Sequence, residues 1–167
     1  MNPAAENAGG EAHGRPSVTV FDRIISGQLP ASFVHQDPHC VSFMDINPIA
    51  SGHVLVVPRL SVATLDALPP EICAHLWRTA QRIGAAQRIG LGSAAQHLLI
   101  NDGKAASQSV PHVHIHVVPR YRGDTLRTLG RMLWHVTTLT LPRPERIIPR
   151  QRLDRQAAAI ATALQGT

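Results

Sequence analysis

The chain has 167 residues, enough for one domain with a hydrophobic core, and no shift in composition indicates a second domain. Apolar residues make up 44% of it, as in globular proteins, and the longest apolar runs are too short for a transmembrane helix. The formal net charge of +5 comes mostly from arginines after position 119, but few aromatic residues are present to stack on bases, so nucleic acid is not expected as a partner.

Two features indicate a cytoplasmic location. The only two cysteines, Cys40 and Cys73, provide no disulfide framework, and each is interpreted as a small buried side chain. The polar N-terminus does not resemble a secretory signal, and no membrane partner is expected.

The first third of the chain predicts a short helix and three strands. Residues 1–16 lack periodicity and are expected to be a disordered leader. A short helix is predicted within residues 18–29, and strand patterns follow at 33–36, 39–45 and 53–58.

The rest of the chain predicts one long helix, two more strands and a terminal helix. The long helix opens at Pro69-Pro70-Glu71 and stops at Gly90-Leu91-Gly92. Strands are predicted at 95–101 and 112–118, and an amphipathic helix is expected at 153–164. This order indicates an α+β fold, a five-stranded antiparallel meander sheet with one long helix and a short N-terminal helix.

Three histidines alternate with apolar residues in the last predicted strand. Successive side chains of a strand point to opposite faces, so one face carries the imidazoles of His112, His114 and His116. The other face, Val113, Ile115 and Val117, is expected to enter the core.

Two simpler interpretations compete with a catalytic role for these histidines. One is a solvated strand face that happens to use histidine. The other is a metal site, but alternate strand positions are about 7 Å apart, so two neighbouring rings could share an ion whereas all three hardly could. A polar groove in which the middle ring is a nucleophile with proton partners fits better, and no metal or other cofactor is expected.

The pattern His-Val-His-Ile-His-Val-Val at 112–118 resembles the signature of the histidine triad (HIT) superfamily. Segments 20–31, 42–48 and 52–59 resemble its N-terminal segment, nucleoside loop and central strand, so the likeness covers residues 18–120. The implied division is a leader at 1–16, a HIT domain at 17–122 and an arginine-rich extension at 123–167 with a possible terminal helix.

The resemblance implies a role for each residue in and around the histidine row, which consists of His112, His114 and His116. In the family the middle histidine, here His114, attacks the α-phosphate of a nucleotide, and water cleaves the nucleotidyl-histidine. The backbone carbonyl of His112 would fix the tautomer of His114, and His116 would contact the phosphate oxygens. Ser109 would bond the bridging atom or the leaving group, and Gln108 would position the phosphate and the attacking water.

Four further positions match nucleotide-contacting residues of the family. Asp45 and Asn47 match ribose contacts, although both could instead serve the turn before Pro48. Asn101 matches a residue near the α-phosphate and could also be a strand-end cap. His53 is expected to support the triad by a hydrogen bond or to be structural. The remaining histidines are interpreted as surface or structural residues: His13, His35, His39, His75, His97 and His135.

Two departures from the family limit the comparison. Some bacterial relatives bind zinc with Cys-x-x-Cys and two histidines, but the cysteine positions are Thr19 and Asp22 here, so no structural zinc is expected. Ser107 stands where the family usually has glycine, at a position where the backbone approaches phosphate, and its side chain could shift the loop.

The resemblance implies a hydrolase or nucleotidyl transferase acting on purine nucleoside monophosphate derivatives, such as dinucleoside polyphosphates or nucleoside phosphoramidates. The alternative is a purine nucleotide-binding or interaction protein with little catalysis. Family members are usually homodimers, so a homodimer is expected.

Overall fold

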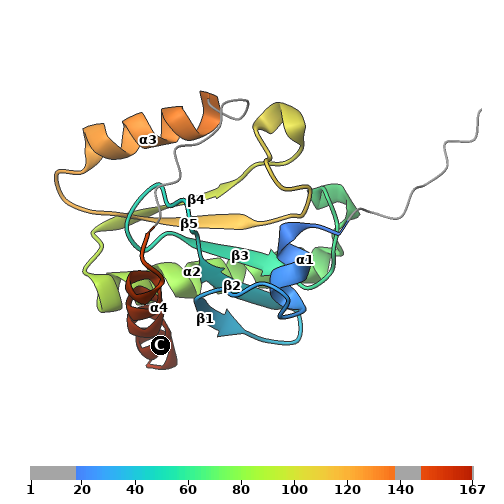
Figure 1. Cartoon of the computed structure of the whole chain (residues 1–167), viewed down its shortest axis with the longest axis horizontal. Helices are drawn as coiled ribbons and strands as arrows, with labels where there is room; N and C mark the ends of the chain where they lie inside the picture. Colours follow the sequence, from blue (N-terminus) through green and yellow to red (C-terminus); the bar gives the residue numbers. More distant parts are fainter. Residues whose placement is uncertain (1–17, 138–147, 167) are drawn as a thin grey trace, which may run out of the picture.

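The computed structural model describes residues 18–137 and 148–166, and the expected leader at 1–16 lies outside this part. Five strands form one antiparallel sheet in the order β1-β2-β3-β5-β4 (Figure 1). Their bounds are β1 Phe33–Gln36, β2 Cys40–Met44, β3 Val54–Pro58, β4 Ala95–Ile100 and β5 Ile115–Arg120. The predicted α+β class and the five-stranded antiparallel sheet are confirmed.

The order of the last two strands follows from the long helix. Strands β1 to β3 form the predicted meander, but the meander does not extend over all five strands, because β5 inserts between β3 and β4. Helix α2, Pro70–Leu91, connects β3 to β4 and leaves the position next to β3 in the sheet open, so that β4 forms the edge of the sheet. Strand β5 then returns into the gap and pairs with both neighbours. The strand that carries the last histidine is therefore an interior one.

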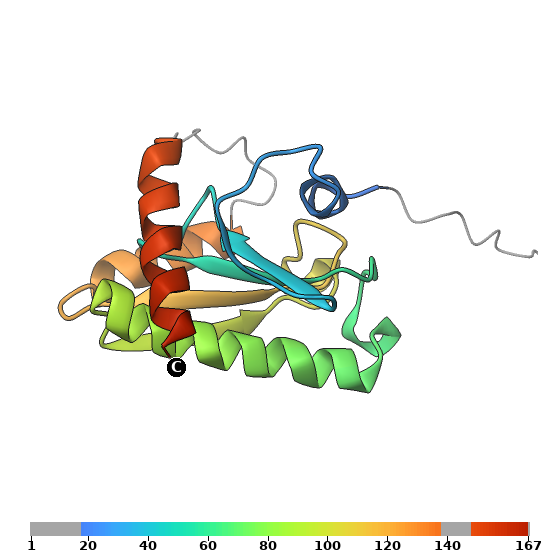
Figure 2. The same cartoon turned by 90° about the horizontal axis from the view of Figure 1, so that it is seen from below.

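The sheet lies between helices. Figure 2 shows α2 along one face and α1, Val20–Ile25, on the other. Helix α4, Arg150–Gln165, packs against α2 and β1. Gly90 of α2 permits this contact, because a Cβ there would lie 2.6 Å from the carbonyl oxygen of Ala159. The helix expected at 153–164 is thus present, beginning three residues earlier.

Local chemistry sets the ends of the first two helices. Thr19 and Asp22 form a reciprocal capping box that starts α1. This helix is shorter than the predicted 18–29, because the chain turns at Ser26 and Gly27, where φ is +77°. Helix α2 ends at Leu91 and is followed by Gly92, which has the left-handed conformation common after helices.

Strand β5 begins three residues later than predicted, at Ile115 instead of position 112. Pro111 has no N–H to give to a ladder, and the N–H of Val113 donates to the carbonyl of Val62 instead of a neighbouring strand. The alternation of side chains nevertheless continues through this segment. Val113, Ile115 and Val117 are buried in the core under α2, as expected.

One helix was not predicted. Helix α3, Thr125–Thr137, follows β5. Met132 packs against Ile49 and Ala50, and Arg131 donates to the carbonyl of Ile49, so α3 lies against the loop after β2. Two 3-10 turns complete the described part, η1 Leu65–Ala67 and η2 Lys104–Ala106. Among the described residues, no helix combines the length and the apolar character needed to span a bilayer.

Candidate active site

The three histidines lie side by side and are almost entirely shielded from solvent. His112 is 0% exposed, His114 4% and His116 6%. His116 lies on β5 opposite Leu55 and Leu99, whereas the other two precede the strand. A solvated strand face would expose such side chains, so this interpretation is excluded. Their ring nitrogens must be satisfied by the protein or by a ligand.

His114 is held by a neighbouring backbone group. Its Nδ1 donates to the carbonyl oxygen of His112 at 2.7 Å. Its ring lies edge-on to Phe21, with centroids 5.1 Å apart, and 4.7 Å from the ring of His116. Because Nδ1 carries the hydrogen in this bond, the lone pair of neutral His114 is on Nε2. This is the tautomer that nucleophilic attack through Nε2 requires.

The ring of His112 has a different environment. Its Nε2 donates to the carbonyl of Pro58 at 2.9 Å, and the Thr19 hydroxyl lies 3.2 Å from Nδ1. Burial lowers the pKa of His112 below 6.5, although the Pro58 carbonyl and the Asp22 carboxylate oppose that shift. The ring is therefore neutral at pH 7. Its anchoring fixes the carbonyl that receives the hydrogen of His114.

The positions that correspond to the zinc-binding cysteines form a hydrogen-bonded network. The hydroxyls of Thr19 and Ser61 lie 2.8 and 3.1 Å from Asp22 Oδ2. Burial opposes ionisation of Asp22, but hydrogen bonds from Thr19 and Ser61 lower its pKa. Zinc sites use thiolate, imidazole and carboxylate ligands, and only Asp22 and His112 remain here. These residues do not fit a zinc ion.

A second chain of polar contacts leads to His116. Its Nδ1 lies 3.0 Å from His53 Nε2, and both residues are buried. His53 Nδ1 lies 3.3 Å from the N–H of Ile49 and 3.2 Å from Asp45 Oδ2. A neutral His53 that accepts the Ile49 hydrogen donates through Nε2, and His116 then carries its own hydrogen on Nε2. A protonated His53 would instead donate to both Asp45 and His116.

The ribose-matching residues serve a turn in this structure. Asp45 Oδ1 accepts the backbone N–H of Asn47 at 2.8 Å, which is turn chemistry, and the Asn47 side chain is exposed. The other carboxylate oxygen contacts His53. The expected bond from His53 to the histidine row is present, and the contact of Asp45 with His53, which was not expected, extends it. The spacing of Asp45 and His53 across a short turn was the available signal.

The loop before the row contains the other predicted residues. Gln108 donates to the carbonyl of Ala63 at 2.7 Å and accepts from the N–H of Gly103 at 3.1 Å. Both ends of its side-chain amide are therefore bonded to backbone groups of the protein. Asn101 Nδ2 lies 3.5 Å from the carbonyl of Ser107, and Ser109 is exposed. The structure thus places His53 in contact with the histidine row, whereas the amide of Gln108 is bonded to Ala63 and Gly103.

Ser107 has a left-handed backbone, with φ of +68° and ψ of +29°. Among the described residues it is the only non-glycine with positive φ. Residues other than glycine are disfavoured in this conformation. The loop therefore keeps the backbone shape of a glycine position although a serine occupies it.

Within residues 18–137 and 148–166, two groups of side chains could hold a metal by their donor types. Asp45, His53 and His116 offer one ligand atom each within 4.8 Å of one another, but they are already joined in the chain of contacts described above. The second group lies in the β1–β2 hairpin and contains His35.

Comparison with known proteins identifies relatives of this fold and site. The family described as "HIT domain" matches residues 26–123. An uncharacterized HIT-like protein of Mycobacterium tuberculosis is 40% identical over 114 residues, covering 68% of this chain and 79% of that protein. A protein named adenylylsulfatase HINT3, from Arabidopsis thaliana, is 37% identical over 107 residues, covering 64% of this chain and 54% of its own length.

A solved structure agrees over a larger share of the chain. The zinc-bound histidine triad family protein from Mycobacterium smegmatis superposes with a TM-score of 0.69 at 35% identity, covering 88% of this chain and 93% of the other. The chain therefore shares the overall fold of a histidine triad family protein.

Proposed function

The chain belongs to the HIT family, which includes nucleotide-binding hydrolases and transferases, and we propose that it cleaves the α-phosphate linkage of nucleoside monophosphate derivatives. The single observation that carries this proposal is the 2.7 Å bond from His114 Nδ1 to the carbonyl of His112, which puts the lone pair on Nε2. The substrate class is dinucleoside polyphosphates or nucleoside phosphoramidates of a purine.

The proposed reaction has two steps. His114 Nε2 attacks the α-phosphorus, a P–N bond forms, and the bond from phosphorus to the oxygen or nitrogen of the leaving group breaks. The leaving atom takes a proton supplied from solvent through the Ser109 hydroxyl. Water then attacks the phosphorus, the P–N bond breaks, and the nucleoside monophosphate and neutral His114 are released while the proton of the water returns to solvent.

Charge on the phosphoryl oxygens must be stabilised in both steps. The Nε2–H of His116, directed through His53, is the donor we assign to these oxygens. His112 acts through its carbonyl, and its neutral buried ring holds that carbonyl in place. Asp45, Asn47 and Asn101 are proposed to contact the nucleoside and the α-phosphate, as the family resemblance implies. Asp45 would then divide its two oxygens between the nucleotide side and His53.

One observation favours the alternative, a nucleotide-binding protein with little catalysis. The Gln108 amide, which would orient the phosphate and the attacking water, is bonded at both ends within the protein. Hydrolysis of the nucleotidyl-histidine would be slow if these bonds persisted. Such a protein would bind purine nucleotides and turn over little.

Turnover assays separate the two functions. The wild type is incubated with a dinucleoside polyphosphate and with a nucleoside phosphoramidate, and release of nucleoside monophosphate is measured. His114→Ala should abolish release. His97→Ala is the matched control, because His97 lies on β4 and bonds Arg120, and it should retain activity. Equal turnover by His114→Ala would remove His114 from the mechanism, and nucleotide binding without turnover by the wild type would favour the alternative.

We also propose that the protein is a cytoplasmic homodimer. Strand β4 is an edge of the sheet, and edge strands readily pair with a second chain. Leu99 on that strand and Trp77 on α2 are exposed apolar side chains. The free cysteines Cys40 and Cys73 are compatible with a reducing compartment.

A further inference from the structure

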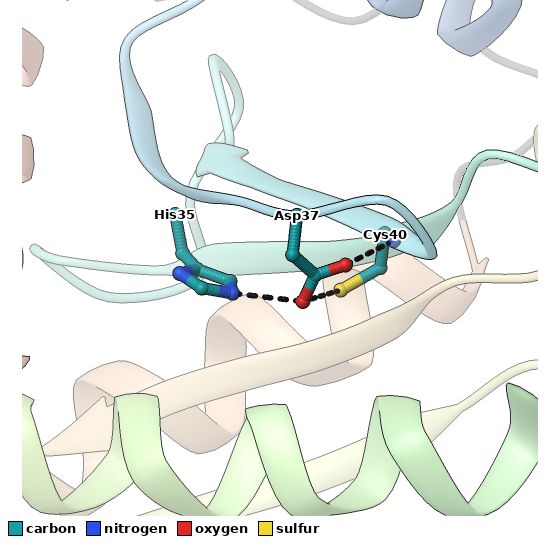
Figure 3. Close-up of side chains that lie close together, drawn as sticks. All are labelled: His35, Asp37 and Cys40. Carbon is teal, nitrogen blue, oxygen red and sulfur yellow. Dashed lines mark hydrogen bonds and ion pairs between the residues drawn. The ribbon is translucent and has the colours of Figure 1, made fainter.

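Three side chains with metal-ligating atoms meet in the β1–β2 hairpin. His35, Asp37 and Cys40 each offer one ligand atom, and these atoms all lie within 4.8 Å of one another. His35 Nε2 is 2.9 Å and Cys40 Sγ 3.5 Å from Asp37 Oδ2 (Figure 3). Cys40 belongs to the core cluster under α2, whereas the His114 ring packs against Phe21 of α1. The hairpin group is therefore separate from the histidine row.

The hairpin itself orients the carboxylate of Asp37. Its Oδ1 accepts the backbone N–H groups of His39 and Cys40, both at 2.8 Å, which leaves Oδ2 directed at the other two side chains. The pairing of β1 with β2 shifts register between Phe33 and His35. A bulge of this kind re-aims a side chain, here the imidazole of His35. The three ligand atoms are thus positioned by local backbone structure.

A second imidazole reaches the same carboxylate oxygen from α2. His75 Nε2 lies 2.7 Å from Asp37 Oδ2, and its ring lies 5.2 Å from that of His39. The side chains of His35, Asp37 and His75 are 21%, 18% and 28% exposed, whereas Cys40 is fully buried. An ion could therefore arrive from solvent beside the partly exposed imidazoles of His35 and His75 and then reach the buried sulfur of Cys40.

We propose that His35, Asp37 and Cys40 bind a divalent metal ion of the zinc class, with His75 as the fourth ligand. Two imidazoles, a thiolate and a carboxylate are the ligand types that zinc prefers, and four ligands match its tetrahedral geometry. Bonds of about 2.0–2.3 Å to one ion require ligand atoms somewhat farther apart than the present 2.7 and 2.9 Å contacts, so the imidazoles move outward slightly on binding.

The proton balance of binding is simple. Burial and the Asp37 carboxylate raise the pKa of the Cys40 thiol to about 12, so the metal-free thiol is neutral. The ion displaces this proton to solvent, because a thiol that coordinates a metal is deprotonated. In the metal-free protein both imidazoles donate from Nε2 to the Asp37 carboxylate, so each neutral ring moves its one hydrogen to Nδ1 when Nε2 binds the ion. One proton is released for each ion bound.

This site is distinct from the zinc-binding position considered above and does not depend on the proposed nucleotide chemistry. From the sequence alone, His35 and His75 are interpreted as surface or structural residues and Cys40 as a buried side chain. The same contacts could instead serve as a metal-free hydrogen-bonded network that closes the hairpin. The two interpretations differ in whether the Cys40 sulfur ever bonds an ion.

Cobalt substitution tests the proposal directly. Co²⁺ is titrated into the full-length metal-free protein while the thiolate-to-cobalt charge-transfer band and the visible bands of tetrahedral cobalt are recorded, and Zn²⁺ is then added in competition. We expect one equivalent to bind with both features. Cys40→Ser should lose the charge-transfer band, and His35→Ala and Asp37→Asn should weaken binding at least tenfold.

Two controls make the result specific. Cys73→Ser removes the other cysteine and should leave the spectrum unchanged. His53→Ala removes a histidine of the Asp45, His53 and His116 group and should also leave the spectrum unchanged. Because Cys40 is a core residue, folding of each variant is checked by circular dichroism, and the more exposed His35 and Asp37 variants provide the test if Cys40→Ser unfolds. A titration without a thiolate band, or a band that disappears only in Cys73→Ser, would overturn the proposal.

Discussion

His53 Nε2 lies 3.0 Å from His116 Nδ1, and both side chains are buried. This contact joins the start of β3 to the histidine row across the β3–β5 pair. Through it, the hydrogen of His53 determines which nitrogen of His116 is a donor. The ring of His116, which we propose to contact the phosphate, is thus oriented by a residue outside the histidine row.

Removing the His53 ring should lower catalysis more than nucleotide binding. In His53→Ala, His116 loses the partner that holds its hydrogen on Nε2. We expect kcat/KM to fall about ten- to hundredfold, the effect of losing about 1.5–3 kcal/mol of a hydrogen bond to a charged group. Steady-state kinetics over a pH series measures this effect. Asp45→Asn, which keeps the ring, should change the pH profile with a smaller loss, and unchanged kinetics in both variants would refute the assigned role.

Position 107 should tolerate glycine and resist β-branched residues. Ser107 has φ of +68°, where a Cβ is disfavoured by about 1–2 kcal/mol. Ser107→Gly relieves this cost but gains unfolded-state entropy, so the free energy of unfolding should change by less than about 1 kcal/mol. Ser107→Val should lower it by about 1 kcal/mol or more.

Denaturant unfolding of the Ser107 variants provides the measurement. Ser109→Val is the matched control for the stability comparison, because Ser109 is exposed and is not among the positive-φ residues. It should be nearly neutral for stability. If Ser107→Val and Ser109→Val lowered the free energy of unfolding equally, the positive φ at position 107 would not be the cause of the destabilisation.

Acid unfolding should reveal the ion pair after β5. Hydrogen bonds from Arg120 hold the pKa of Asp124 at about 2, below its ordinary 3.8. A carboxyl with a lowered folded-state pKa stabilises the fold above its unfolded-state pKa, and this contribution is lost as the pH falls towards 2. Asp124→Asn should therefore be less stable than the wild type at pH 7, and the difference should vanish between about pH 4 and pH 2.

Melting temperatures recorded as a function of pH measure this convergence. Asp22 and Asp37, whose pKa values are also lowered, are present in both proteins and cancel in the difference. A gap in melting temperature that stays constant down to pH 2 would exclude the ion pair as the source.

The proposed homodimer predicts a molecular mass of two chains by sedimentation equilibrium. Leu99→Lys places a charge on the exposed edge strand and should shift the protein towards monomer. Val18→Lys is the control, since this exposed apolar residue precedes α1 and should leave the mass unchanged. A wild-type monomer at micromolar concentration would contradict the proposal.

Regular patterns in the sequence were sufficient for most of the fold. The continuous apolar run of β3 and the proline-to-glycine span of α2 predicted these elements within one or two residues. The start of β5 was missed because the N–H of Val113 bonds Val62, a contact that strand alternation does not reveal. Helix α3 carries Leu126, Leu129 and Leu133 at helical spacing, a signal that the interpretation of 123–167 as an arginine-rich extension left unused.

The site was predictable where chemistry is local. The bond between His114 and the carbonyl of His112 spans two residues and was expected from the family resemblance. The contact of His75 with Asp37 joins α2 to a hairpin 38 positions earlier and depends on how the helix packs. Long-range convergence of this kind has no signature in spacing, which is why His75 was not connected with the hairpin.

The covalent intermediate tests the central claim most directly. Wild-type protein is mixed with a nucleoside phosphoramidate, quenched in alkaline denaturant to preserve the P–N bond, and examined by intact and peptide mass spectrometry. We predict an added nucleoside monophosphate on His114 of the wild type and none in His114→Ala. An adduct on another residue, or rapid turnover by His114→Ala, would contradict the assignment of His114 as the nucleophile.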